Sequence, residues 1–131
     1  YVVWHGTSPI TAWYEAVFET DTTFLASQSC AAPGYTESTA YDEATRQAYT
    51  EAAASGQSIT NSANKATITI SDTKTMYGAA LVGGGSAATT KADTAGGGTL
   101  LCAVKFSTAR SVVDGDTLEI TYTISAADDG A

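Results

Sequence analysis

Near its C-terminus the chain reads Thr117-Leu118-Glu119-Ile120-Thr121-Tyr122-Thr123-Ile124-Ser125, and this stretch decides the fold class. The even positions are apolar, and the odd positions are polar and mostly Thr or Ser. Because successive side chains of a strand point to opposite faces, this alternation predicts a strand with one buried and one solvated face. Threonine suits the solvated face, since β-branched side chains fit a pleated surface well.

Five other segments carry strand signals. They span residues 13–19, 57–60, 66–71, 75–82 and 100–106. Residues 75–82 are almost continuously apolar, which is typical of a strand buried on both faces. In residues 13–19, Glu15 and Glu19 share one face, and we expect that face to be solvated.

Turn-forming residues separate these segments. Asp114-Gly115 predicts a tight turn before the last strand, and Asn61-Ser62-Ala63-Asn64 predicts another turn. For residues 41–54 we predict a turn followed by a strand, although Asp42-Glu43-Ala44-Thr45 could also open a helix.

Many short strands separated by turns predict an all-β protein. We expect a single antiparallel β-sandwich, jelly-roll-like, with at most one short helix. The length of 131 residues suits one domain, and no linker divides the chain, so we expect residues 1–131 to form that domain.

The charge balance excludes two classes of partner. The chain has six Lys and Arg residues and 14 Asp and Glu residues, which gives a formal net charge of −8. This is the wrong sign for a nucleic-acid binder, which needs a basic face. An anionic membrane surface would repel the chain, and no apolar run approaches the roughly 20 residues of a membrane span. We therefore expect neither nucleic acid nor membrane as a partner.

No motif in the chain predicts catalysis. His5 is the single histidine and has no readable partner, and there is no GxSxG. The glycine triplets at residues 83–85 and 96–98 lack the ending of a phosphate loop, so we interpret them as a flexible surface loop. We expect no enzyme, no catalytic residue, no cofactor and no metal. A carbohydrate-active enzyme, the weakest alternative, would need a carboxylate pair roughly 5 to 10 Å apart in a cleft.

The two cysteines, Cys30 and Cys102, lie far apart in the sequence. A disulfide between them would close a long loop and stabilise the fold. Two cysteines do not form a disulfide framework, however, so we favour two free thiols and leave the pairing open.

Aromatic residues exceed what one small core needs, and Tyr and Trp are favoured at protein interfaces. We predict an interface that includes Tyr1, Trp4, Trp13, Tyr14, Tyr35 and Tyr41.

A family resemblance covers most of the chain, from about residue 13 to residue 127. Its motifs, in order, are Ile10-Thr11-Ala12-Trp13-Tyr14, Tyr35-Thr36-Glu37, Tyr41-Asp42-Glu43-Ala44-Thr45-Arg46-Gln47, Ser55-Gly56-Gln57-Ser58-Ile59-Thr60-Asn61-Ser62-Ala63, Lys65-Ala66-Thr67, Gly78-Ala79-Ala80-Leu81, Asp93-Thr94-Ala95-Gly96-Gly97-Gly98-Thr99-Leu100 and Val113-Asp114-Gly115-Asp116-Thr117-Leu118. In their order and spacing the chain resembles small virion structural proteins of tailed bacteriophages, described as head decoration, head fibre or tail fibre proteins.

The resemblance implies a non-enzymatic capsid decoration or cement protein that binds the major capsid protein lattice. It implies self-association, with a trimer as one form, and a place on the capsid surface after assembly in the host cytoplasm. The alternative is a head- or tail-fibre module that binds host surface glycans, for which Trp4 and Trp13 are the residues to test. Family members carry an N-terminal stretch before the matching region, and we expect this chain to lack it.

Overall fold

The computed structural model describes residues 9–85 and 88–127, and in these ranges the chain consists of strands and loops. The strands are β1 (Trp13–Phe18), β2 (Gln47–Ala48), β3 (Ser58–Thr60), β4 (Ala66–Thr69), β5 (Lys74–Gly83), β6 (Thr99–Val112), β7 (Thr117–Ile120) and β8 (Thr123–Ser125). Every strand pair is antiparallel, which confirms the all-β prediction. In the described part of the chain, no helix is long and apolar enough to cross a membrane.

A four-stranded sheet with the order β2-β1-β5-β6 forms the centre of the described structure. Strand β5 lies inside it between β1 and β6, which confirms the prediction that the apolar run is buried on both faces. The predicted turn followed by a strand is also confirmed, because bends precede the two-residue strand β2. Strand β6 continues to Val112, six residues beyond its expected end, because polar residues there still pair with β5.

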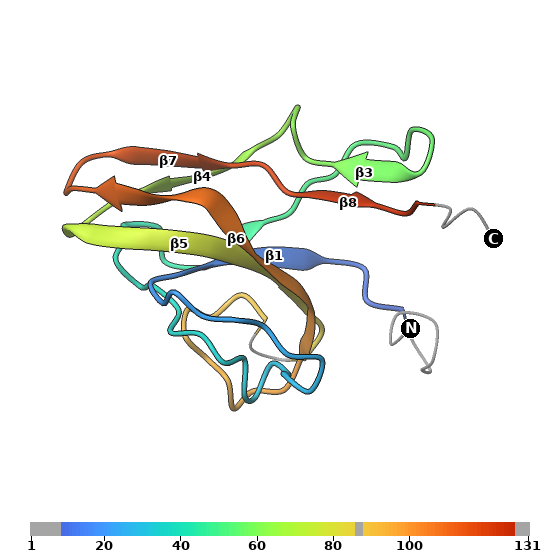
Figure 1. Cartoon of the computed structure of the whole chain (residues 1–131), viewed down its shortest axis with the longest axis horizontal. Helices are drawn as coiled ribbons and strands as arrows, with labels where there is room; N and C mark the ends of the chain where they lie inside the picture. The colour runs from blue at the N-terminus through green and yellow to red at the C-terminus, as the bar shows by residue number, and fades with distance from the viewer. Residues whose placement is uncertain (1–8, 86–87, 128–131) are drawn as a thin grey trace.

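The remaining four strands form a second layer, which we call the ribbon. Strand β3 pairs with β8 and β4 pairs with β7, so two short antiparallel ladders follow one another along the same two chain segments. Figure 1 shows the ribbon running above the sheet. The alternating stretch expected as one strand is therefore two strands, β7 and β8, separated at Thr121 and Tyr122.

Apolar side chains cover both faces of the sheet. Between sheet and ribbon, Val17 and Leu81 pack with Ile68, Ile120 and Tyr122 in the larger core. On the opposite face, a smaller core forms around other residues. It contains Ala16, Cys30, Ala80 and Val82, with Tyr35, Leu100 and Ala103 packed against it. The loops between β1 and β2 and between β5 and β6 supply this second cover (Figure 1).

Both cysteines are free thiols, as we favoured from the sequence. Cys102 packs against the core on the ribbon side, whereas Cys30 belongs to the core on the other face. The sheet therefore lies between the two thiols.

The two glycine triplets, at residues 83–85 and 96–98, lie against each other. A Cβ atom on Gly85 would lie within 3 Å of the backbone of Gly97 and Gly98. Gly85, Gly97 and Gly98 also adopt positive φ angles, which glycine reaches without steric cost. Close backbone contact is thus one reason for glycine here, beyond the flexibility that we inferred.

We predict that Gly78→Ala lowers the free energy of unfolding by about 3 kcal/mol, at the upper end of the usual cost of overpacking. A Cβ atom at this buried position would collide with the Val104 carbonyl oxygen and the Phe18 ring. Gly56→Ala is the control, because Gly56 has a positive φ angle but open space around it, and its cost should stay near 1 kcal/mol. Urea denaturation measures both; equal costs would contradict the packing argument.

Candidate protein interface

The outer edge of β6 is the most prominent unpartnered feature of the sheet. Strand β6 pairs with β5 on one side, and no described strand pairs with its other side. The strand is 14 residues long. An edge strand presents a row of N–H and C=O groups that can pair with another chain, and proteins usually keep such edges short or covered.

Two irregularities divide β6. Leu101 has no partner on β5, because Leu100 pairs with Val82 and Cys102 with Leu81. Further along, the register shifts again between Lys105 and Arg110, where the residues of β6 outnumber those of β5. Bulges of this kind bend a strand and redirect its side chains, and Figure 1 shows β6 bending as it crosses the sheet. The regular pairing between them runs from Cys102 to Lys105.

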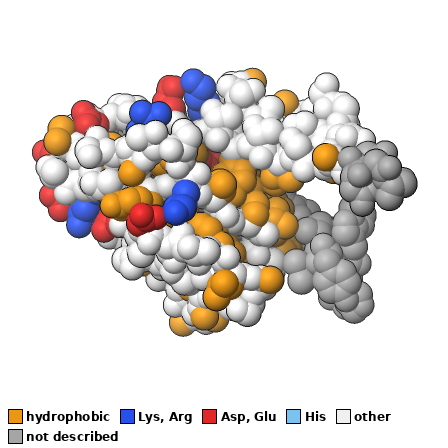
Figure 2. Space-filling model, viewed as in Figure 1, with side chains coloured by type: hydrophobic (Ala, Val, Ile, Leu, Met, Phe, Trp, Pro, Cys, Tyr) orange, Lys and Arg blue, Asp and Glu red, His pale blue; other side chains and the backbone are white. Residues whose placement is uncertain are grey.

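Exposed apolar side chains lie on and beside the first half of β6. Leu101 is 37% exposed and Val104 is 51% exposed, and Leu25 from the loop after β1 is 64% exposed. Leu25 and Leu101 line a hollow of about 190 Å³ together with Phe24 and Leu100. Figure 2 shows apolar side chains across the middle of the face that β6 crosses. Apolar side chains that stay exposed at an unpaired strand edge are candidates for contact with a partner.

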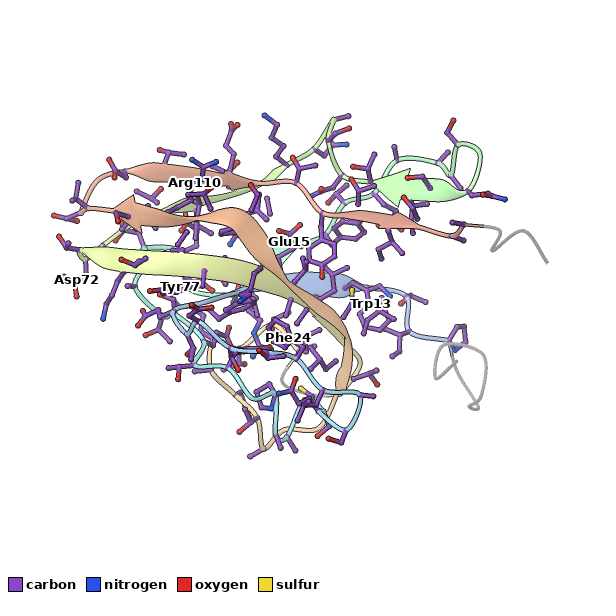
Figure 3. All side chains as sticks on the ribbon, in the orientation of Figure 1. Trp13, Glu15, Phe24, Asp72, Tyr77 and Arg110 are labelled. Atoms are coloured by element: carbon purple, nitrogen blue, oxygen red, sulfur yellow. The ribbon has the colours of Figure 1, made fainter. Side chains whose placement is uncertain are left out.

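A second hollow lies toward the other end of β6. It has a volume of about 260 Å³ and is lined by Phe106 and Arg110 of β6 and by Leu118 and Ile120 of β7. Figure 3 labels Arg110 where β6 passes beneath the ribbon. Arg110 is exposed and makes no hydrogen bond or ion pair with any described residue. This hollow therefore lies on the ribbon side of β6, whereas the first lies against the 24–28 loop.

Strand β6 is basic within an acidic protein. Between Thr99 and Val112 it carries Lys105 and Arg110 and no Asp or Glu. Lys105 Nζ lies 2.9 Å from Asp21 Oδ1 in an exposed pair, which is a weak interaction in water. Arg110 is therefore the β6 cation that has no partner among the described residues.

The described part of the predicted aromatic interface does not lie on β6. Trp13 is half-buried on the ribbon side of β1, where its ring covers Gly83. Tyr35 stacks on Phe18 with ring centroids 5.0 Å apart. Tyr41 is only 4% exposed, and its ring is 4.0 Å from Lys91 Nζ.

Tyr35 and Tyr41 therefore act as core residues in the chain described here, and Tyr41 offers almost no surface. Tyr1 and Trp4 lie outside the described residues, as does His5. Sequence reasoning missed the β6 edge because it counted aromatic residues. Lys105 amid an otherwise apolar run indicated a solvated position, but it did not show that β6 lies at an uncovered edge of the sheet.

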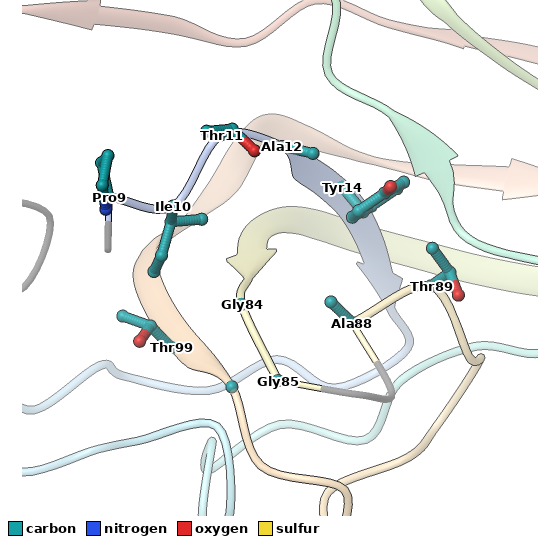
Figure 4. Close-up of a pocket in the computed structure, with 11 residues that line it drawn as sticks. Pro9, Ile10, Thr11, Ala12, Tyr14, Gly84, Gly85, Ala88, Thr89 and Thr99 are labelled. Carbon is teal, nitrogen blue, oxygen red and sulfur yellow. The ribbon is translucent and has the colours of Figure 1, made fainter. Parts of the chain in front are cut away.

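Tyr14 lines a separate open pocket of about 620 Å³. Figure 4 shows Tyr14 and Thr89 on one side of it and Ile10 and Thr99 on the other, with the Gly84 backbone between them. Its described lining combines threonine side chains and one tyrosine with apolar side chains such as Ile10 and with glycine backbone.

A buried polar network joins the sheet to the ribbon. Glu15 is 3% exposed, so the solvated position expected for it is wrong. Asn61 Nδ2 donates hydrogen bonds to Glu15 Oε1 at 2.8 Å and to the Ile120 carbonyl at 3.2 Å, and Asn61 Oδ1 accepts from the Tyr122 N–H at 2.7 Å. Figure 3 shows Glu15 between the sheet and the ribbon. Asn61 thus satisfies the backbone at the break between β7 and β8.

Burial raises the pKa of Glu15 to about 8, and the hydrogen bond from Asn61 limits the rise. The second carboxyl oxygen, Oε2, has no hydrogen-bond partner among the described residues. An unpaired buried oxygen favours the neutral carboxylic acid, because a charge there would lack both water and a counter-ion.

Two hollows each have a single carboxylate in their described lining. The Arg110 hollow contains Glu119, and a hollow of about 250 Å³ on the loop side contains Glu37, which is bound to Arg46. The described residues include no group of three or more His, Cys, Asp or Glu that could hold a metal ion.

Comparison with known proteins adds no relative, since no family model, curated protein sequence or solved structure matches this chain.

Proposed function

We propose that this chain is a non-enzymatic virion structural protein of a tailed bacteriophage, a capsid decoration protein that binds the major capsid protein lattice. The observation that carries the proposal is the open edge of β6, with Leu101 and Val104 exposed along it. A decoration protein needs such a surface, because it must dock on a lattice through its own backbone and side chains. The sequence resemblance supports the same role.

The rest of the molecule fits this role. A net charge of −8 and a surface rich in Thr and Ser favour a soluble outer face that resists aggregation. The proposal includes a homo-oligomer on the capsid surface. It also includes a single antiparallel β-sandwich of jelly-roll type, supported by the packing of the ribbon on the sheet through one shared core.

Immunogold labelling of purified particles tests the proposed function. The particles come from the phage that encodes the chain, and the antibody is raised against the recombinant chain. We expect regular labelling of the heads and copurification of the protein with DNA-filled particles. A protein that is missing from washed particles, or that labels the tail alone, would contradict the proposed role in capsid decoration.

The Tyr14 pocket favours a second candidate function, glycan binding by a head- or tail-fibre module. Aromatic rings flanked by hydroxyl groups are typical of sugar-binding faces, and Tyr14 lies beside Thr89 in this pocket. A glycan array tests this candidate: binding that Tyr14→Ala abolishes would support it, and an array without signal would rule it out.

A further inference from the structure

We propose that the β6 edge binds an extended acidic segment of a partner protein by strand addition, with one apolar side chain of that segment in each of the two hollows. This inference rests on the proposed function for the role of the surface as an interface. It adds the conformation, the charge and the side-chain spacing of the partner.

Backbone pairing is the first step of the argument. The outer edge of β6 is unpaired, and its regular stretch from Cys102 to Lys105 presents main-chain groups in strand geometry. No proline interrupts β6. An added strand can therefore form a ladder here, and main-chain hydrogen bonds give such complexes their affinity.

The two hollows define the side chains that the segment must carry. The hollow at Leu101 lies against the 24–28 loop, and the hollow at Phe106 and Arg110 lies under β7 of the ribbon. They open on opposite sides of the same strand. Because side chains alternate across a strand, the two anchoring residues must be an odd number of positions apart. Leu101 and Phe106, which line the two hollows, lie five positions apart along β6, or roughly 17 Å, so the two anchoring residues of the segment should also lie about five positions apart.

Charge selects the partner. The β6 strand itself carries Lys105 and Arg110 and no carboxylate. Lys105 pairs weakly with the exposed Asp21, and Glu119 lines the hollow beside Arg110, so Arg110, which has no partner among the described residues, is the cation that a partner can bind. A carboxylate on the added segment can pair with the Arg110 guanidinium, which binds carboxylates through two parallel N–H groups. A second copy of this chain fits less well, because edge-to-edge pairing of two β6 strands would bring their cations together and join two chains of charge −8.

The probe is the blocked heptapeptide Leu-Thr-Val-Thr-Glu-Ile-Asp together with its reversed sequence, which covers both strand directions. NMR titration of the ¹⁵N-labelled chain measures binding. We expect saturable shifts at the amides of β6 for at least one direction, and at least tenfold weaker binding when both acidic residues of that peptide are lysine. Shifts that lie elsewhere, no binding in either direction, or equal affinity for the lysine peptide would overturn the inference.

Two variants form a matched pair for this test. Val104 and Val113 are both 51% exposed, but only Val104 lies on β6. Val104→Glu should weaken binding at least tenfold, whereas Val113→Glu should leave it within about twofold, and both should retain the fold. Equal effects of the two substitutions would also overturn the inference.

Failure of the strand-addition inference and failure of the proposed function are distinguishable. A chain that labels phage heads but does not bind the peptide overturns strand addition alone. A chain that binds the peptide but is missing from washed particles overturns the decoration role alone.

Discussion

Replacing Arg46 by methionine should lower the free energy of unfolding by about 3 to 5 kcal/mol, the range for breaking one side of a buried ion pair. The guanidinium binds Glu37 through two nitrogens, with Nε 2.8 Å from Oε1 and Nη2 2.6 Å from Oε2. Its Nη1 also donates to the Ala88 carbonyl at 3.0 Å. Both charged side chains are at least 95% buried. The variant leaves the Glu37 charge buried without a counter-ion.

This ion pair also joins the loops that cover the second face of the sheet. Arg46 precedes β2, Glu37 belongs to the loop after β1, and Ala88 and Ala92 belong to the loop after β5. The Ala92 N–H donates to Glu37 Oε2 at 3.0 Å. We therefore expect the loops to become more accessible as stability falls, which hydrogen exchange would detect.

Urea denaturation at pH 7 measures the effect of Arg46→Met. Lys65→Met is the matched control, because the Lys65–Glu119 pair is about half exposed and should contribute at most about 1 kcal/mol. The double variant Glu37→Gln/Arg46→Met should recover part of the lost stability, since it removes the buried Glu37 charge that would otherwise have no counter-ion. A single variant no less stable than the control would contradict the structural role of the pair.

Glu15→Gln should remove a large part of the pH dependence of stability between about pH 4.5 and pH 8. Burial raises the folded-state pKa of Glu15 to about 8, compared with 4.5 for an unperturbed Glu. The folded state therefore holds a proton that the unfolded state releases. Stability from this group is fully present below about pH 4.5 and is lost as the pH rises to about 8. The loss amounts to about 1.4 kcal/mol per pH unit, on the order of 4 kcal/mol between pH 5 and pH 8.

Unfolding free energies of Glu15→Gln and of the natural chain, measured at several pH values from 5 to 8, test this prediction. The stability of Glu15→Gln relative to the natural chain should grow steadily over this range, because glutamine stays neutral in both states. Glu119→Gln is the control, since it makes the same substitution at an exposed carboxylate beside Lys65. Parallel curves for Glu15→Gln and the natural chain would show that the buried acid is not responsible.

Local pattern was sufficient to locate several strands of this protein. Alternation and apolar runs located the segments that became β1, β3, β4 and β5, because the side-chain period of a strand is a property of a few consecutive residues. Asp114-Gly115 likewise marked the turn between β6 and β7, where Gly115 adopts a positive φ angle.

The candidate interface could not be predicted in this way. Leu101 and Val104 have the pattern of buried residues, and only the sheet order leaves them at an uncovered edge. Tyr41, which we expected at an interface, is buried because the loop that contains it folds over the core. Exposure depends on which distant segments pack nearby, and a local pattern contains no information about them.

The sequence by itself determined that this protein is acidic and all-β, because the net charge follows from the composition and the side-chain period of a strand follows from a few consecutive residues. Only the tertiary structure decided that Glu15 is buried and that residues 117–125 form two strands. Asn61 contacts both features, since it reaches from the β3–β4 turn to Glu15 and to the backbone of Ile120 and Tyr122. Such long-range hydrogen bonds form only when the ribbon packs on the sheet, so no local pattern of residues can specify them.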